Sequence, residues 1–98
     1  MGKKKLVTIV TEAVLESKLV DDLGRFGAKG FTIMEARGSG TSGVRDADWD
    51  QNRNIKIEII CDEQIASLIT EHCRKEYYSN YAMVIYLTKV EILRPGKF

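Results

Sequence analysis

Residues 30–61, GFTIMEARGSGTSGVRDADWDQNRNIKIEIIC, place a long polar segment between two stretches that are typical of β-strands. Gly30–Arg37 is rich in apolar residues, and Asn54–Cys61 alternates isoleucine or cysteine with lysine and glutamate, as in a strand with one buried face. The segment between them, Gly38–Asn54, has no apolar periodicity. Loops longer than ~12–15 residues usually serve as lids or binding segments, or stay disordered. The sequence therefore predicts a β-hairpin with its function at the base of the loop.

The two halves of this loop differ in chemistry. Residues 38–43 (GSGTSG) offer closely approachable backbone N–H groups and hydroxyl donors, and the forked guanidinium of Arg45 suits a phosphate or a carboxylate. The second half could meet a cation or a basic partner, because aspartates flank the only tryptophan: Asp46, Asp48, Trp49 and Asp50. The alternative for the whole segment is a flexible, solvated loop without a ligand.

On the N-terminal side, Lys5–Thr11 is apolar on both parities and predicts a central strand that is buried on both faces. An amphipathic helix follows, with apolar residues at helical spacing: Leu15, Leu19, Val20, Leu23 and Phe26. Its opposite, polar face is assigned to Glu16, Lys18, Asp21, Asp22 and Arg25. Gly27 stands where a helix stop belongs.

On the C-terminal side, Asp62 can cap a second helix whose expected buried stripe is Ile65, Leu68, Ile69, His72, Cys73 and Tyr77. Residues 77–81 turn the chain into a last strand, Met83–Leu93, which ends before Pro95. The order βαββαβ predicts one α+β domain over residues 1–98, with the ferredoxin-like fold. In this fold an antiparallel sheet has both helices on one face, and here a long loop joins strands 2 and 3.

The helix-free face of this sheet is expected to be apolar as well. Neighbouring residues of opposite parity are both apolar in three strands: Leu6 with Val7, Ile59 with Ile60, and Val84 with Ile85. Covering such side chains is worth ~25 cal/mol per Å² of apolar surface, which favours a homo-oligomer that packs through its sheets. The alternative is a twisted and partly solvated sheet in a monomer.

Composition argues against several classes of protein. The formal charge of +1 shows no nucleic-acid footprint, and the basic start lacks the apolar stretch of a signal peptide, so we expect a soluble, cytoplasmic protein. Cys61 and Cys73 form no metal-ligand motif and are expected to be buried, reduced thiols. His72 lies in an apolar stripe and lacks a nucleophile signature, which favours a packed histidine over a catalytic base. The aspartates of the loop lack the rest of an EF-hand pattern, so no metal site is assigned.

Several segments together resemble the PII signalling superfamily, and more narrowly its cyanobacterial SbtB type. These segments are Gly30-Phe31-Thr32, Glu35-Ala36, the glycine-rich loop with Val44-Arg45, residues 78–82 (YSNYA), Val84-Ile85-Tyr86 and Lys97-Phe98. The resemblance implies a homotrimer with an adenine-nucleotide site in each cleft between subunits. It also implies that Gly38–Asn54 is the T-loop of the family. The expected ligands are cAMP, AMP, ADP and ATP, with Ca²⁺ or Mg²⁺ accompanying ATP.

The resemblance assigns roles residue by residue. Thr32 would lie beside the adenine, Gly38, Ser39, Gly40 and Thr41 near the ribose and phosphates, and Arg45 toward phosphate. Backbone groups of Ala82, Met83 and Val84 would read the adenine, and Arg94 would reach a neighbour's phosphates. Two departures stand out: Ser42 replaces an arginine of many SbtB sequences, and the chain stops at Phe98 without their cysteine-containing end.

The expected function is therefore regulatory and not enzymatic. An SbtB-type protein controls the bicarbonate transporter SbtA, so the chain would sit at the inner membrane through this partner, and nucleotides would act by ordering the T-loop. Three alternatives remain, and one of them is a purely structural trimer that binds no ligand. A small ferredoxin-like phosphate-ester hydrolase could use Arg45, and an RRM-type module has the same element order but would need aromatic residues within Ile55–Ile59, which has none.

Overall fold

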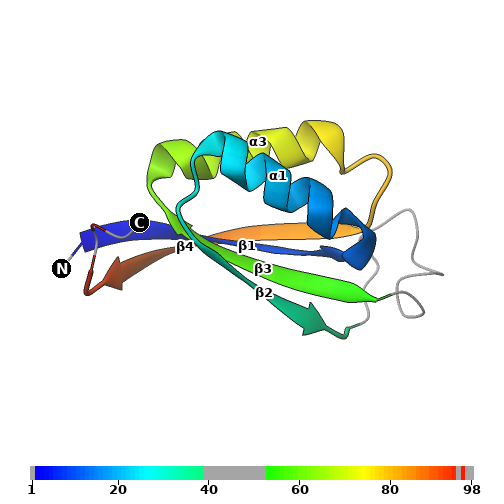
Figure 1. Cartoon of the computed structure of the whole chain (residues 1–98), viewed down its shortest axis with the longest axis horizontal. Coiled ribbons are helices and arrows are strands. Elements are labelled where there is room, and N and C mark those ends of the chain that lie inside the picture. Colours follow the sequence, from blue (N-terminus) through cyan, green and yellow to red (C-terminus); the bar gives the residue numbers. More distant parts are fainter. Residues whose placement is uncertain (1, 39–52, 95, 97–98) are drawn as a thin grey trace.

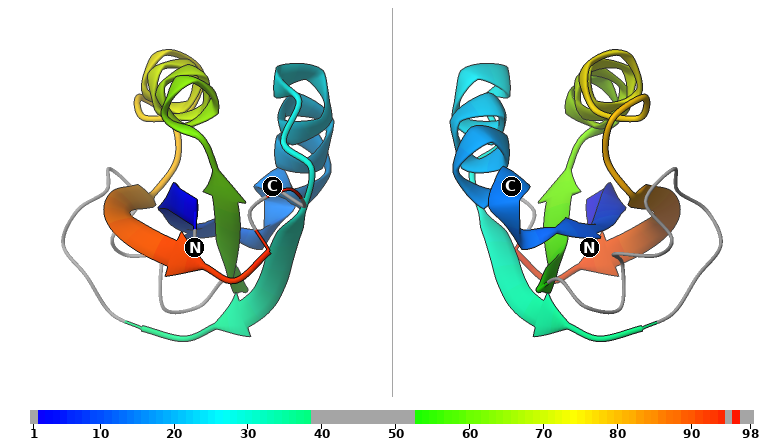
Figure 2. Two further views of the ribbon diagram at one scale, coloured as in Figure 1. Left: turned by 90° about the vertical axis from the view of Figure 1, so that its left-hand side faces the viewer. Right: turned by 90° about the vertical axis from the view of Figure 1, so that its right-hand side faces the viewer.

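The computed structural model describes residues 2–38, 53–94 and 96, and within them the chain forms one sheet with both helices on the same face (Figures 1 and 2). Its elements are β1 (Gly2–Glu12), the 3-10 turn η1 (Ala13–Leu15), α1 (Glu16–Phe26), β2 (Phe31–Ala36), β3 (Asn54–Cys61), α3 (Glu63–Glu76) and β4 (Met83–Ile92). The strand order is β2-β3-β1-β4, and all pairs are antiparallel. This confirms the ferredoxin-like α+β fold.

β1 is a central strand, as its apolar sequence predicts. It pairs with β3 on one side and with β4 on the other. Three successive residues, Val7, Thr8 and Ile9, are at most 1% exposed, although their side chains alternate between the faces of the sheet. The middle of β1 is therefore covered on both sides.

The ends of the helices follow local sequence signals. Gly27 ends α1 in the left-handed conformation with φ 85°, which a residue with a Cβ adopts only under strain. Asp62 caps α3, and its side-chain oxygen accepts a hydrogen bond from the Ile65 N–H at 3.0 Å. Both predicted helix signals are confirmed.

The buried stripe of α3 lies slightly to one side of the predicted one. Its centre is Ala66, Ile69, Cys73 and Tyr77, which follow the helical repeat and pack on the sheet. Leu68 was expected in the stripe, but this prediction is wrong, because it lies off that line and is 50% exposed.

The two faces of the sheet are packed to different degrees. Beneath the helices, Ile9, Ile57 and Ile59 are fully buried together with most of the core. The cross-strand register places a second apolar group on the other face, called here the open face: Leu6, Val10, Met34, Ile60, Val84 and Tyr86. These six range from partly buried to 47% exposed, which confirms that apolar side chains occupy both faces.

Candidate functional site

Three strands begin or end close to Gly38 and Arg53, the described residues on either side of the predicted loop. β1 ends at Glu12, β3 begins at Asn54, and β4 begins just after Ala82, all at the same end of the sheet (Figure 1). Gly38 and Arg53 are the last described residues on either side of the predicted loop. We call this end, with Thr11, Glu12, Gly38, Arg53, Asn54 and Ala82–Val84, the loop-base site.

Hydrogen bonds from β1 fix the entry to β4 in this site. A side-chain oxygen of Glu12, Oε2, accepts from the Ala82 N–H at 2.8 Å, and the Thr11 hydroxyl donates to the Ala82 carbonyl at 2.7 Å. Glu12 is only 3% exposed, and Thr11 is fully buried. A hydrogen bond to a carboxylate contributes about 1.5–3 kcal/mol and one between neutral groups about 0.5–1.5 kcal/mol, so together the two bonds hold the turn firmly against β1.

This arrangement limits how the turn can read a ligand. The N–H of Ala82 and one lone pair of its carbonyl are already used within the chain. β4 is an edge of the described sheet, and in its antiparallel pair with β1 every second residue turns its N–H and C=O away from β1, so one of the two neighbours Met83 and Val84 has its backbone groups open to another molecule. The backbone of Met83 and Val84 is therefore better placed than that of Ala82 to contact an adenine ring.

The predicted site residues are spread over the sheet. Ala82 and Met83 are buried in the loop-base site, Val84 is 37% exposed on the open face, and Gly38 is exposed. Thr32 is exposed in β2, opposite Glu58. Four further predicted residues lie outside the described ranges: Ser39, Gly40, Thr41 and Arg45.

Arg94 lies at the far end of the sheet from the other predicted residues. The register pairs Met83 with Thr11 near one end of β1 and Ile92 with Gly2 at the other. β4 has 10 residues, which span about 30 Å at ~3.3 Å per residue. One subunit therefore cannot bring Arg94 and the turn before β4 to the same small ligand.

Two contacts tie Arg53 to its surroundings at the loop-base site. Its carbonyl accepts from the Ala13 N–H at 2.9 Å, and its guanidinium lies 3.4 Å from a carboxylate oxygen of Glu35. The ion pair is exposed and adds little stability, so the backbone bond holds the start of β3. Sequence reasoning missed Glu12, although a carboxylate at the end of an otherwise apolar strand is a signal for a buried acceptor.

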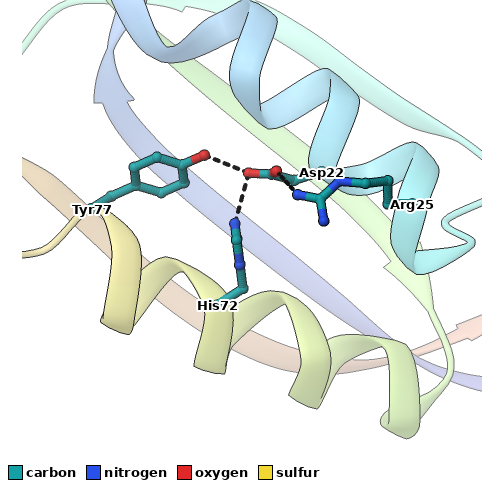
Figure 3. A network of polar contacts seen from close by, with 4 residues as sticks. All are labelled: Asp22, Arg25, His72 and Tyr77. Carbon is teal, nitrogen blue, oxygen red and sulfur yellow. Dashed lines mark hydrogen bonds and ion pairs between the residues drawn. The ribbon is translucent and has the colours of Figure 1, made fainter.

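A second polar cluster joins the two helices (Figure 3). Asp22 Oδ2 accepts from the Tyr77 hydroxyl at 2.5 Å and lies 3.0 Å from His72 Nε2, while Oδ1 pairs with Arg25. Burial, and then the hydrogen bond to Asp22, raises the pKa of Tyr77. The assignment of Asp22 to the polar face is wrong, because Asp22 is 6% exposed. It stands three residues after Leu19, and this spacing placed it on the buried side.

His72 is packed as its position in the stripe predicts. Its ring meets the rings of Phe26 and Tyr77 edge-on, with centroids 5.1 Å and 5.7 Å away, and its side chain is 22% exposed. Asp22 provides its polar contact. The arrangement is that of a histidine which helps to join two helices.

The other candidate groups are packing elements. Cys61 and Cys73 are free and buried, as predicted, and burial raises their pKa to about 11 and about 12. Across residues 2–38, 53–94 and 96, no cluster of three or more His, Cys, Asp or Glu side chains could hold a metal ion. In the same residues, neither helix is long and apolar enough to cross a membrane.

The chain is similar to known proteins in both sequence and structure. The family model of the nitrogen regulatory protein P-II matches residues 4–97. A crystal structure described as a PII-like signalling protein, from Thermus thermophilus, is 43% identical, covers 98% of this chain and 95% of its own, and superposes with a TM-score of 0.82.

Two more distant structures share the fold. CPII from Thiomonas intermedia, solved with ADP and bicarbonate, is 23% identical over 99% of this chain and 95% of its own, with a TM-score of 0.83. GlnK of B. subtilis, solved with ATP, is 22% identical over 93% of this chain and 86% of its own, with a TM-score of 0.68.

Proposed function

The chain belongs to the nitrogen regulatory protein P-II family, and from this premise we propose that it is a signalling protein which senses adenine nucleotides by binding them. The match over residues 4–97 is the observation on which the proposal rests. The nucleotides in the CPII and GlnK structures, ADP and ATP, support this ligand class. Following the SbtB resemblance, the ligands of this chain are ATP, ADP, AMP and cAMP, with Ca²⁺ or Mg²⁺ accompanying ATP.

The proposed site lies between subunits of a homotrimer. Two features support this: the open face has six apolar side chains for a neighbour to cover, and Arg94 is too far from Met83 for one subunit to use both. One subunit would supply Thr32, the loop base with Gly38, Ser39, Gly40 and Thr41, Arg45, and the backbone at Ala82–Val84. The next subunit would supply Arg94 toward the phosphates.

The proposed output is control of a membrane transporter for bicarbonate, SbtA in the SbtB-type systems. The nucleotide would order the T-loop, Gly38–Asn54, and change the surface that meets the transporter. The protein would then be cytoplasmic and held at the inner membrane by this partner. CPII was solved with ADP and bicarbonate bound, which supports a link between nucleotide binding and inorganic carbon in this proposal.

Calorimetry tests the proposed ligand class directly. ATP, ADP, AMP and cAMP are titrated into the full chain, with and without Mg²⁺ or Ca²⁺, and GTP serves as the matched control. We expect saturable binding of at least one adenine nucleotide, with one site per subunit, and much weaker binding of GTP. If none of the four adenine nucleotides bound, the proposed function would be refuted.

The T-loop proposal has its own readout, because Trp49 is the only tryptophan and Arg45 and Arg53 are trypsin sites. Saturating nucleotide should change the fluorescence of Trp49 and slow cleavage after either arginine. Binding that left both signals unchanged would refute the switch but not the nucleotide site.

A further inference from the structure

The turn between α3 and β4, residues 77–82, is folded around Tyr77. The Tyr77 carbonyl accepts from the N–H groups of Asn80 at 3.1 Å and Tyr81 at 3.0 Å. Its ring meets the ring of Tyr81 edge-on, with centroids 6.2 Å apart. The turn leads directly into Met83, so the position of Tyr77 sets where β4 begins.

The side chain of Tyr77 is itself fixed from α1. Its hydroxyl donates to Asp22 at 2.5 Å, and the same carboxylate contacts Arg25 and His72 (Figure 3). Tyr77 and Asp22 are both only 6% exposed. Because a buried hydrogen bond to a carboxylate is costly to break, the turn is anchored to α1 at this end.

The other end of the turn is anchored to β1. Ala82 donates to Glu12 and accepts from Thr11, both of which are buried. The middle of the turn, Tyr78–Asn80, is exposed. The turn is thus a short strap with two fixed ends, one on a helix and one on the sheet.

We propose that Asp22, His72 and Tyr77 are positioning residues for the nucleotide site. They do not touch the ligand. They hold the turn so that the backbone of Met83 and Val84 is already in place when the adenine arrives, and a site ordered in advance loses less conformational freedom on binding. This inference rests on the proposed function, because it assumes that the adenine is read at Met83 and Val84.

A double-mutant cycle measures the effect on binding. Calorimetry with ATP and AMP compares the natural chain with Tyr77→Phe, Asp22→Asn and the double variant. We expect each single variant to weaken binding about fivefold to tenfold, a typical coupling between linked sites. The double variant should bind about as weakly as the weaker single one, because Tyr77→Phe removes the hydroxyl that donates to Asp22 and Asp22→Asn removes the charge that strengthens the same contact.

Two control variants separate positioning from general destabilisation. Tyr81→Phe removes a hydroxyl from the same turn, and this hydroxyl has no hydrogen bond to any of the described residues. Ile69→Val lowers stability through the buried side of α3 and leaves every polar group of the cluster in place. We expect both controls to bind nucleotide as the natural chain does. Losses in the controls equal to those in Tyr77→Phe would overturn the inference.

Amide hydrogen exchange without nucleotide tests the first step alone. In Tyr77→Phe, the N–H groups of Asn80, Tyr81 and Ala82 should exchange about tenfold faster, while those in the centre of β1 stay protected. Unchanged exchange in the turn would refute the inference. If the natural chain bound no nucleotide, the proposed function would fail, and positioning of the turn would then be judged on exchange alone.

Discussion

The two faces of the sheet differ in how completely a single chain buries their apolar side chains. Under the helices, Val7, Ile9 and Ile57 are fully buried by α1 and α3. On the open face, Val84 and Tyr86 are 37% and 47% exposed, although Met83 and Ile85, which precede them in sequence, pack in or against the core. Stability of the single chain thus comes from one face, and the other is available for assembly.

This contrast explains where function can lie. The covered face also fixes the loop-base site, because Thr11 and Met83 belong to it and are buried. The open face has Thr32 and Val84, two of the residues expected at the nucleotide. A ligand site that uses both faces needs a neighbouring subunit to close it.

The largest loss of stability is expected from a substitution on the covered face. Ile9→Asp would put a charge without a partner into the core, where the cost exceeds the net stability of a typical domain of about 5–15 kcal/mol. We expect no cooperative unfolding transition in circular dichroism. A folded Ile9→Asp variant with a normal transition would show that this face is not the core.

The same substitution one residue further along should have a different result. Val10 lies on the open face and is partly buried, so Val10→Asp should leave the subunit folded, since water can reach the new carboxylate. Sedimentation should then show monomers, and calorimetry should show no nucleotide binding. A Val10→Asp monomer that still bound nucleotide normally would contradict a site between subunits.

Alkaline pH should lower the stability of the covered face by a smaller amount than Ile9→Asp. Burial raises the pKa of Cys73 from 9.0 to about 12, so its neutral thiol stabilises the fold below pH 9, and this contribution is lost as the pH rises toward 12. The free energy of unfolding, measured in urea, should fall across this range. Cys73→Ala should make the fall shallower without abolishing it, because the pKa of Cys61 is also raised, to about 11. Equal slopes would show that Cys73 does not titrate as its burial implies.

Local patterns sufficed for much of the fold. Alternation predicted β3 as Asn54–Cys61, and the Gly27 stop and the Asp62 cap are short-range signals that the structure confirms. Asp22 and Leu68 were misplaced, since the packing of one helix on the other decides which side of a helix is buried. Glu12 was missed because its partner, Ala82, is 70 residues away in the chain.

The candidate site was less predictable than the fold. The types of residue came from the resemblance, the predicted strand Met83–Leu93 already separated Met83 from Arg94, and the register shows which end of β1 each of them faces. Because one subunit cannot bring both residues to the same small ligand, a site that uses both would have to be shared between subunits. The roles of these residues at a nucleotide remain predictions.

Mixed trimers test that claim most directly. Arg45→Ala and Arg94→Ala subunits are prepared separately, and each alone should bind ATP about tenfold to a hundredfold more weakly, the loss expected for a charge-assisted contact. The two are then unfolded and refolded together in equal amounts, and ATP binding is measured by calorimetry. In the proposed site each cleft takes one arginine from each of two neighbours, so about a quarter of the sites should regain full affinity. If no site recovers in trimers shown to be mixed, both arginines act from one subunit, and the account of a shared site is wrong.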